Sequence, residues 1–168
     1  MSPLSAPGGA CRVNIDKKFR ANWKYYSFQS FLATLVLFVI LIALELQNAV
    51  ITASIGATAF IIFTMPDSIT AFPRNVIGGH VLGLVFGAVC ALIPHALWVH
   101  AALIYSLAVG LSIFSMILLD VEHPPAAGTA LGMAITGATW SVTGALIFSI
   151  FSLCLIHKLF RGRLRNLV

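Results

Sequence analysis

Charged side chains are scarce in this sequence: only 9% of its 168 residues are Asp, Glu, Lys or Arg, whereas 60% are hydrophobic. Soluble domains average about 25% charged and about 45–50% apolar residues. A chain this short must expose much of its surface, so a large core does not explain the difference. The composition therefore excludes a soluble enzyme, a nucleic-acid-binding protein and a disordered chain, and it predicts a polytopic membrane protein.

Cysteine is also rare. Cys11, Cys90 and Cys154 are widely spaced, and two of them lie inside apolar runs. This spacing excludes a disulfide framework and a cysteine-based metal site. The five histidines are scattered along the chain, so we expect no metal site, no cofactor and no catalytic group.

The basic residues that are present gather at the two ends of the chain. Five lie within residues 12–24 and four within residues 158–165, and only Arg74 lies between these clusters. Basic clusters beside apolar segments mark the cytoplasmic side and attract anionic lipid headgroups. We therefore expect both termini to be cytoplasmic, an even number of membrane crossings, contact with membrane lipids and no nucleic-acid partner.

Four apolar runs approach or exceed the length of about 20 residues that a membrane-spanning helix needs. They cover approximately residues 27–46, 75–93, 99–119 and 138–157. Two shorter apolar segments, Ala49–Met65 and Pro124–Gly137, are rich in small residues, and each lies between two long runs. The sequence thus predicts an all-α membrane protein with four long transmembrane helices and two short or broken membrane helices.

The order long, short, long occurs twice, and aligning Thr58 with Thr129 gives an offset of 71 residues. If the short segments cross the membrane, each half has three crossings and the halves are inverted; if they are re-entrant, the halves are parallel. We favour the first arrangement, a 3+3 pseudo-repeat, because it puts Arg74 on the cytoplasmic side. The predicted parts are a cytoplasmic segment with an amphipathic lead-in (1–26), a transmembrane domain (27–157) and a basic cytoplasmic tail (158–168).

The short segments carry the candidate site. Pro124 and Pro125 predict the start of a helix, because proline fits the first helical turn. Residues 126–129 have minimal side chains, so their N–H groups at the positive helix end are suited to an anion. Residues 54–58 offer a similar backbone in the other half, and two such sites meeting predict a small-anion site. Helix–helix packing through the same small residues is the alternative.

Polar residues near these segments complete the candidates. His80 lies two turns inside the third run, where an ionisable group usually indicates function; a hydrogen-bonded structural histidine is the alternative. We expect Arg74 either to attract anions at one mouth of the path or to pair with Asp67 in a loop. Glu45 ends the first run, where we expect its side chain to reach the interface.

Two motifs resemble the HPP family of integral membrane proteins. They are ASIGATAFIIFTMPDSITAFPRNVIGGH at Ala53–His80 and EHPPAAGTAL at Glu122–Leu131, and the family is named for the His-Pro-Pro found here at 123–125. The resemblance covers roughly residues 20–157. The family's second motif usually reads HPPAGATAL, so Ala127 and Gly128 stand in swapped order here.

The resemblance implies transport, because family members from cyanobacteria and chloroplasts are associated with nitrite movement across membranes. We expect a bacterial inner-membrane member that moves a small inorganic anion, with nitrite as the named substrate. The small size of the chain predicts a homo-oligomer. The predicted substrate-binding residues are Ser54, Gly56, Ala57, Thr58, Arg74, Asn75, His80, His123, Pro124, Pro125, Ala127, Gly128 and Thr129.

In the leading hypothesis the anion lies between the two broken helices, and His80 or His123 couples binding to protonation. A membrane-embedded enzyme that uses His123 with Asp120 or Glu122 is one alternative. A structural or sensor subunit, whose basic tails bind a partner, is the other.

Overall fold

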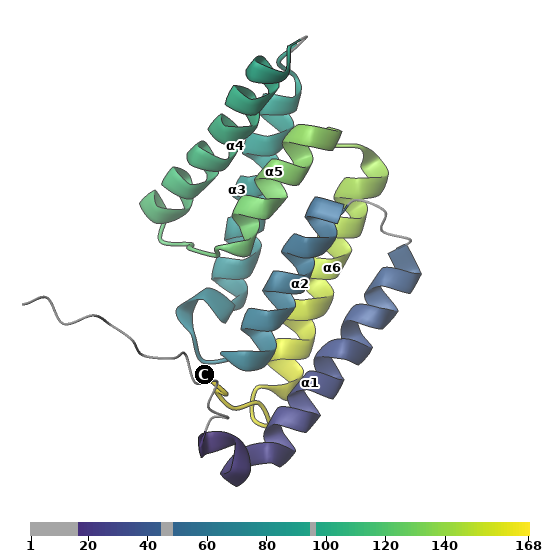
Figure 1. Cartoon of the computed structure of the whole chain (residues 1–168), viewed down its shortest axis with the longest axis vertical. Coiled ribbons are helices and arrows are strands. Elements are labelled where there is room, and N and C mark those ends of the chain that lie inside the picture. The colour runs from purple at the N-terminus through teal and green to yellow at the C-terminus, as the bar shows by residue number, and fades with distance from the viewer. Residues whose placement is uncertain (1–16, 45–48, 95–96) are drawn as a thin grey trace, which may run out of the picture.

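The computed structural model describes residues 17–44, 49–94 and 97–168, and the regular elements in these ranges are helices (Figure 1). This confirms the all-α prediction. The expectations for Cys11, for Glu45 and for most of the N-terminal segment fall outside the described residues. The elements are α1 (Lys17–Leu44), α2 (Ala49–Thr64), the 3-10 helix η1 (Ile69–Ala71), α3 (Pro73–Ala91), α4 (Trp98–Leu118), α5 (Pro125–Thr136) and α6 (Trp140–Phe160).

Four helices are long and apolar enough to cross a membrane: residues 22–42 of α1, and the whole of α3, α4 and α6. Helix α2 has 16 residues and α5 has 12. At 1.5 Å per residue they extend about 24 Å and about 18 Å, less than the hydrocarbon core of about 30 Å. The predicted order long, short, long therefore occurs in both halves of the chain. Consecutive helices run in alternating directions (Figure 1).

Local sequence sets where helices α3, α5 and α6 begin and where α5 ends. Helices α3 and α5 carry proline in their first turn, where the missing N–H has no helical partner to lose. Gly137, with a φ of 75°, ends α5 in a backbone region that favours glycine. Thr139 caps α6, because its hydroxyl accepts a hydrogen bond from the Val142 N–H.

Helix α5 lies in the interior of the bundle, where it packs against α2, α3 and α4 (Figure 1). Glycines make its contact with α3 unusually close. A methyl group on Gly83 would collide with the Ala126 carbonyl oxygen, and one on Gly87 would collide with that of Ala130. Small residues allow helix backbones to approach in this way inside membranes. The glycine face of α3 therefore packs within the chain.

The chain ends near the beginning of α1. The Tyr26 hydroxyl donates a hydrogen bond to the Leu167 carbonyl at 2.7 Å, and the Leu167 N–H donates to the Thr64 carbonyl at 2.8 Å. Leu164 and Leu167 are buried, so the segment after α6 packs onto α1 and α2 instead of extending away. The two basic ends thus share one end of the molecule, the arrangement that an even number of crossings requires.

Candidate functional site

A cluster of buried polar side chains lies where α2, α3 and α5 meet. Their exposed fractions range from 0% to 4%. Polar groups at such depth destabilise a protein unless they are hydrogen-bonded. The members are Ser54 and Thr58 of α2, Asn75 and His80 of α3, His123 of the segment before α5, and Thr129 of α5. All six were predicted site residues, and the structure brings them together.

Thr58 joins the two histidines at the centre of the cluster. Its Oγ1 lies 2.9 Å from His80 Nε2 and 3.0 Å from His123 Nε2. The two imidazole rings have their centroids 5.0 Å apart. His80 Nδ1 lies 2.8 Å from Thr129 Oγ1, so one hydroxyl binds each side of the His80 ring.

Backbone carbonyl oxygens accept hydrogen bonds from three side chains of the cluster. His123 Nδ1 lies 2.8 Å from the Thr70 carbonyl oxygen. A carbonyl only accepts, so this ring nitrogen carries a hydrogen. Ser54 Oγ donates to the Pro125 carbonyl at 2.6 Å and lies 2.9 Å from Thr129 Oγ1. Thr58 Oγ1 also lies 3.0 Å from the Ser54 carbonyl oxygen. Because a carbonyl only accepts, the Thr58 hydroxyl donates its hydrogen to this oxygen.

The five cluster members other than Asn75 have fewer hydrogens than hydrogen-bonded pairs. Five side chains, two histidines and three hydroxyls, form seven such pairs, four with one another and three with carbonyl oxygens. A neutral imidazole and a hydroxyl each supply one hydrogen. When both histidines are neutral, five hydrogens are available for seven pairs, so two pairs have no hydrogen between their atoms. The cluster can therefore take up a proton without losing a hydrogen bond.

The predicted anion site on backbone N–H groups is wrong. The Ala126 N–H donates to the His123 carbonyl at 2.9 Å and the Ala127 N–H to the Pro124 carbonyl at 3.1 Å, so the first turn of α5 satisfies its own donors. Gly56 lies in the interior of α2, where its N–H belongs to the helical hydrogen-bond ladder. Residues 54–58 do not break that helix, because they contain no proline and a single glycine does not end a well-packed helix.

The remaining small residues divide between packing and surface. A methyl group on Gly128 would lie 3.3 Å from Ser54 Cβ, so Gly128 lets α5 approach α2 closely. Ala57 is exposed and Gly56 is half-buried, and a methyl group added to Gly56 would have no neighbouring atom within 4 Å. Helix–helix packing, the alternative considered for these residues, thus explains Gly128.

An apolar groove of about 390 Å³ opens beside the cluster, against the end of α4 and the beginning of α5. Pro124 and Ala127 line it, so these two predicted residues face the groove and not the hydroxyls. His123 is the member of the buried cluster that borders the groove. The full lining is Ile113, Met116, Ile117, Glu122, His123, Pro124 and Ala127.

Arg74 lies outside the cluster. Its Nη1 is 3.3 Å from Asp120 Oδ2, and its Nη2 donates to the Leu119 carbonyl at 3.3 Å. The expected pair with Asp67 is therefore wrong, because the start of α3 lies beside the end of α4. Asp67 instead uses its backbone N–H, which donates to Asn166 Oδ1 at 3.3 Å. Asn75, one residue further along α3, is a member of the cluster and donates to the Glu122 carbonyl, beside His123.

One contributor to the cluster cannot be predicted from the sequence. Thr70 supplies a carbonyl oxygen to His123, and a backbone acceptor leaves no signal in the residue type. His157 of α6 is also buried, but its Nε2 lies 2.9 Å from the Pro66 carbonyl oxygen and not beside the cluster members. Within residues 17–44, 49–94 and 97–168 no group of three or more His, Cys, Asp or Glu is placed to hold a metal.

Comparisons with known proteins identify the group to which this arrangement belongs. A transmembrane protein of Dictyostelium discoideum is 40% identical over 98 residues, which are 53% of this chain and 31% of that protein. A second transmembrane protein of the same organism is 31% identical over 121 residues, which are 66% of this chain and 35% of that protein. This chain thus spans about a third of the length of these relatives, and no solved structure matches it.

The family described as "HPP, transmembrane region" matches residues 15–163, a range that contains helices α1 to α6 in full. The match contains the Ser54–Thr58 segment, His80 and the His123-Pro124-Pro125 motif that together build the buried cluster. The chain therefore belongs to the HPP family of integral membrane proteins.

Proposed function

We propose that the chain transports a small inorganic anion across the membrane, with nitrite as the substrate, and that the buried cluster lies on its path. The observation that carries the proposal is the shortage of hydrogens among Thr58, His80, His123 and their partners. Membership of a polytopic membrane family and the resemblance of the two motifs to nitrite-associated members support it.

The shortage of hydrogens determines how an anion is held. An anion accepts hydrogen bonds and donates none, and its charge is costly in a low-dielectric interior unless it is compensated. The cluster contains no lysine or arginine among the described residues that form it. A proton that binds His80 or His123 supplies both the missing donor and the positive charge. Anion and proton therefore cross together.

The groove beside His123 is the proposed access to the cluster. His123 borders the groove and bonds Thr58 through Nε2. Separation of His123 Nε2 from Thr58 Oγ1 opens the cluster toward Pro124 and Ala127. Arg74, already paired with Asp120, holds the ends of α3 and α4 together at one mouth of this path.

Orientation and assembly are parts of the same proposal. Both termini are cytoplasmic, since the basic residues near them lie at one end of the molecule. The protein forms homo-oligomers in a bacterial inner membrane. Gly144 on α6 is available for a contact between chains, because it is exposed and no atom lies within 4 Å of a methyl group built on it.

The enzyme alternative receives no geometric support. Asp120, one of the two carboxylates considered as a partner of His123, pairs with Arg74. Both His123 ring nitrogens bond to Thr70 and Thr58, and Glu122 contributes its carbonyl to Asn75. We therefore propose that the chain is a transporter and not an enzyme.

Nitrite flux in proteoliposomes tests the proposal. The Thr58→Val variant keeps the shape of the side chain but removes the hydroxyl between the histidines, so we expect flux to fall to the level of empty liposomes. Thr34→Val is the matched control, because the Thr34 hydroxyl is exposed on α1 and bonds only its own helix at Ser30. Wild-type flux no greater than that of empty liposomes would reject the function.

A further inference from the structure

The segment after α6 is built into the fold by hydrogen bonds on two sides. The Arg165 N–H donates to Gln29 Oε1 at 3.0 Å, and Gln29 Nε2 donates back to the Arg165 carbonyl at 2.9 Å. Gln29 is fully buried, and Leu167 anchors the last residues through Thr64 and Tyr26. The backbone that carries Arg163 and Arg165 is therefore held at a fixed place beside α1.

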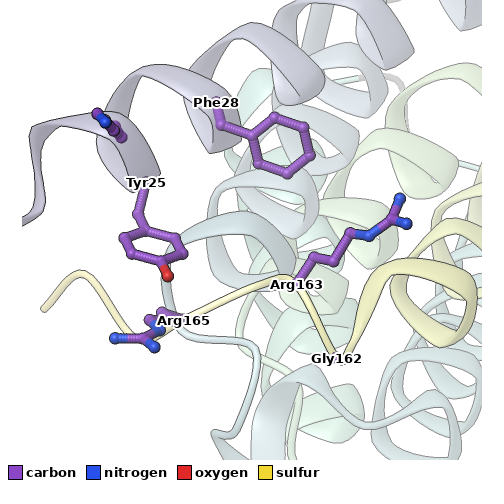
Figure 2. Close-up of a pocket in the computed structure, with 6 residues that line it drawn as sticks. Tyr25, Phe28, Gly162, Arg163 and Arg165 are labelled. Atoms are coloured by element: carbon purple, nitrogen blue, oxygen red, sulfur yellow. The ribbon is translucent and has the colours of Figure 1, made fainter.

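This anchoring creates a basic pocket between α1 and the segment after α6. Figure 2 shows Tyr25 and Phe28 extending from α1 toward the chain that carries Arg163 and Arg165. The hollow has a volume of about 390 Å³ and is open to solvent. Its lining, called the basic pocket below, is Lys24, Tyr25, Phe28, Gly162, Arg163 and Arg165.

Three positive charges meet in the basic pocket, and none of the described residues that line it carries a carboxylate. The Arg165 guanidinium lies 4.4 Å from the centroid of the Tyr25 ring, which orients it without neutralising it. Within the described parts of the chain, the ion pair that is formed joins Arg74 to Asp120, elsewhere in the molecule. Asp67 lies near this end through its contact with Asn166 but is not part of the lining. Like charges held together favour binding of an anion.

The donor groups and the position of the pocket favour a phosphate-bearing anion. Arginine presents a planar fork of donors that matches the oxygens of a phosphate group, and lysine adds a point charge. The pocket lies where the apolar span of α1 begins, at residue 22, with Trp23 exposed beside it. Aromatic and basic residues at this level are typical of the headgroup region of a bilayer.

We propose that the basic pocket binds the phosphate group of an anionic ligand, and that this ligand is a membrane lipid whose acyl chains lie along α1. Phe28, with 38% of its side chain exposed, forms the apolar side of the pocket toward the membrane. The lipid joins α1 to the segment after α6 on the surface of the bundle, outside the buried histidine cluster.

Lipid retention measured by native mass spectrometry tests this site on the full chain. We expect the purified protein to keep phosphatidylglycerol, which has an anionic phosphate headgroup, in preference to phosphatidylcholine. Arg163→Gln should weaken phosphatidylglycerol binding about fivefold, because one basic residue near an anionic surface contributes about that factor to the affinity. Lys158→Gln removes the same charge from an exposed position on α6 outside the pocket and should change binding less than about twofold.

Two further measurements test whether the variant folds and whether the bound phosphate belongs to a lipid or is free in solution. Arg163→Lys keeps the charge and should restore most of the binding, whereas a misfolded variant would not be rescued. Inorganic phosphate at millimolar concentration should not displace the lipid. Displacement by phosphate without a preference for phosphatidylglycerol would overturn the lipid assignment, and equal losses for Arg163→Gln and Lys158→Gln would overturn the site.

Discussion

At the scale of single residues, the hydroxyl of Thr58 is the shared partner of two buried histidines. It lies within 3.0 Å of a ring nitrogen of each, and its own exposed fraction is zero. Valine has the same shape but no hydroxyl, so Thr58→Val leaves two ring nitrogens without a partner. A buried polar atom that loses its partner destabilises a protein by about 1–3 kcal/mol.

We therefore predict that Thr58→Val lowers the free energy of unfolding, whereas Thr58→Ser, which retains the hydroxyl, loses less. Thermal unfolding of the detergent-solubilised variants measures the difference. Thr34→Val again serves as the control at an exposed hydroxyl. Equal Tm values for the Val and Ser variants at position 58 would show that the hydroxyl does not hold the histidines.

A second prediction concerns Arg74, whose ion pair with Asp120 is exposed, with relative accessibilities of 66% and 79% for the two side chains. Exposed ion pairs contribute about 0–1 kcal/mol. Arg74→Gln should therefore lower the free energy of unfolding by less than Thr58→Val does, as measured in the same detergent. A larger loss at Arg74 would mean that the pair has a structural role beyond its two charges.

At the scale of elements, the contact between α3 and α5 depends on glycines. A methyl group at Gly83 would collide with a carbonyl oxygen of α5, and backbone cannot move aside without separating the helices. Gly83→Ala should destabilise the protein by about 1–3 kcal/mol, the usual effect of overpacking. Gly110→Ala, on α4 with open space around the glycine, should be neutral or stabilising by up to about 1 kcal/mol. Opposite signs in thermal unfolding confirm the close contact, and equal signs contradict it.

The packing of α2 against α5 leads to a prediction for transport. A methyl group built on Gly128 would lie only 3.3 Å from Ser54 Cβ. Gly128→Leu should push α2 away from α5, separate Ser54 from Thr129 and abolish nitrite flux. Gly56→Leu adds the same bulk on α2 where no neighbour lies within 4 Å, so its flux should stay near the wild-type rate. Flux retained by Gly128→Leu would place the path elsewhere.

Much of the element pattern could be predicted from the sequence, because apolar run length and the positions of proline determine where membrane helices begin. The hydrogen bonds made by the N–H groups at the start of α5 could not be predicted. They depend on where the backbone places the carbonyls of His123 and Pro124. His80 and His123 were both recognised as candidates. That one threonine joins them follows from how three helices cross, which no local pattern encodes.

At the scale of the whole molecule, the last residues of the chain contact the beginning of α1 and the end of α2. The connection between α2 and α3 must therefore lie on the same side of the membrane as the C-terminus. In a background without the native cysteines, Asp67→Cys should react with a membrane-impermeant thiol reagent from the cytoplasmic side only. Thr139→Cys, between α5 and α6, should react from the opposite side, and labelling of both from one side would contradict six crossings.

At this scale, the proposed function requires a protein with few charges to carry an anion. Five buried side chains lack two hydrogens for their seven pairs, so in the proposed mechanism an anion enters only with a proton. Charge compensation by a proton leaves the interior neutral before and after each transport event. A permanently buried arginine or lysine, which is costly in a membrane, is then unnecessary.

Proton movement during nitrite uptake tests this coupling most directly. Proteoliposomes that contain a trapped pH indicator are given an inward nitrite gradient at equal internal and external pH, and empty liposomes measure the passive leak. We predict that wild-type protein acidifies the lumen in step with nitrite uptake, beyond the leak, and that Thr58→Val removes the excess. Nitrite uptake above the leak without acidification would contradict the joint transport of anion and proton.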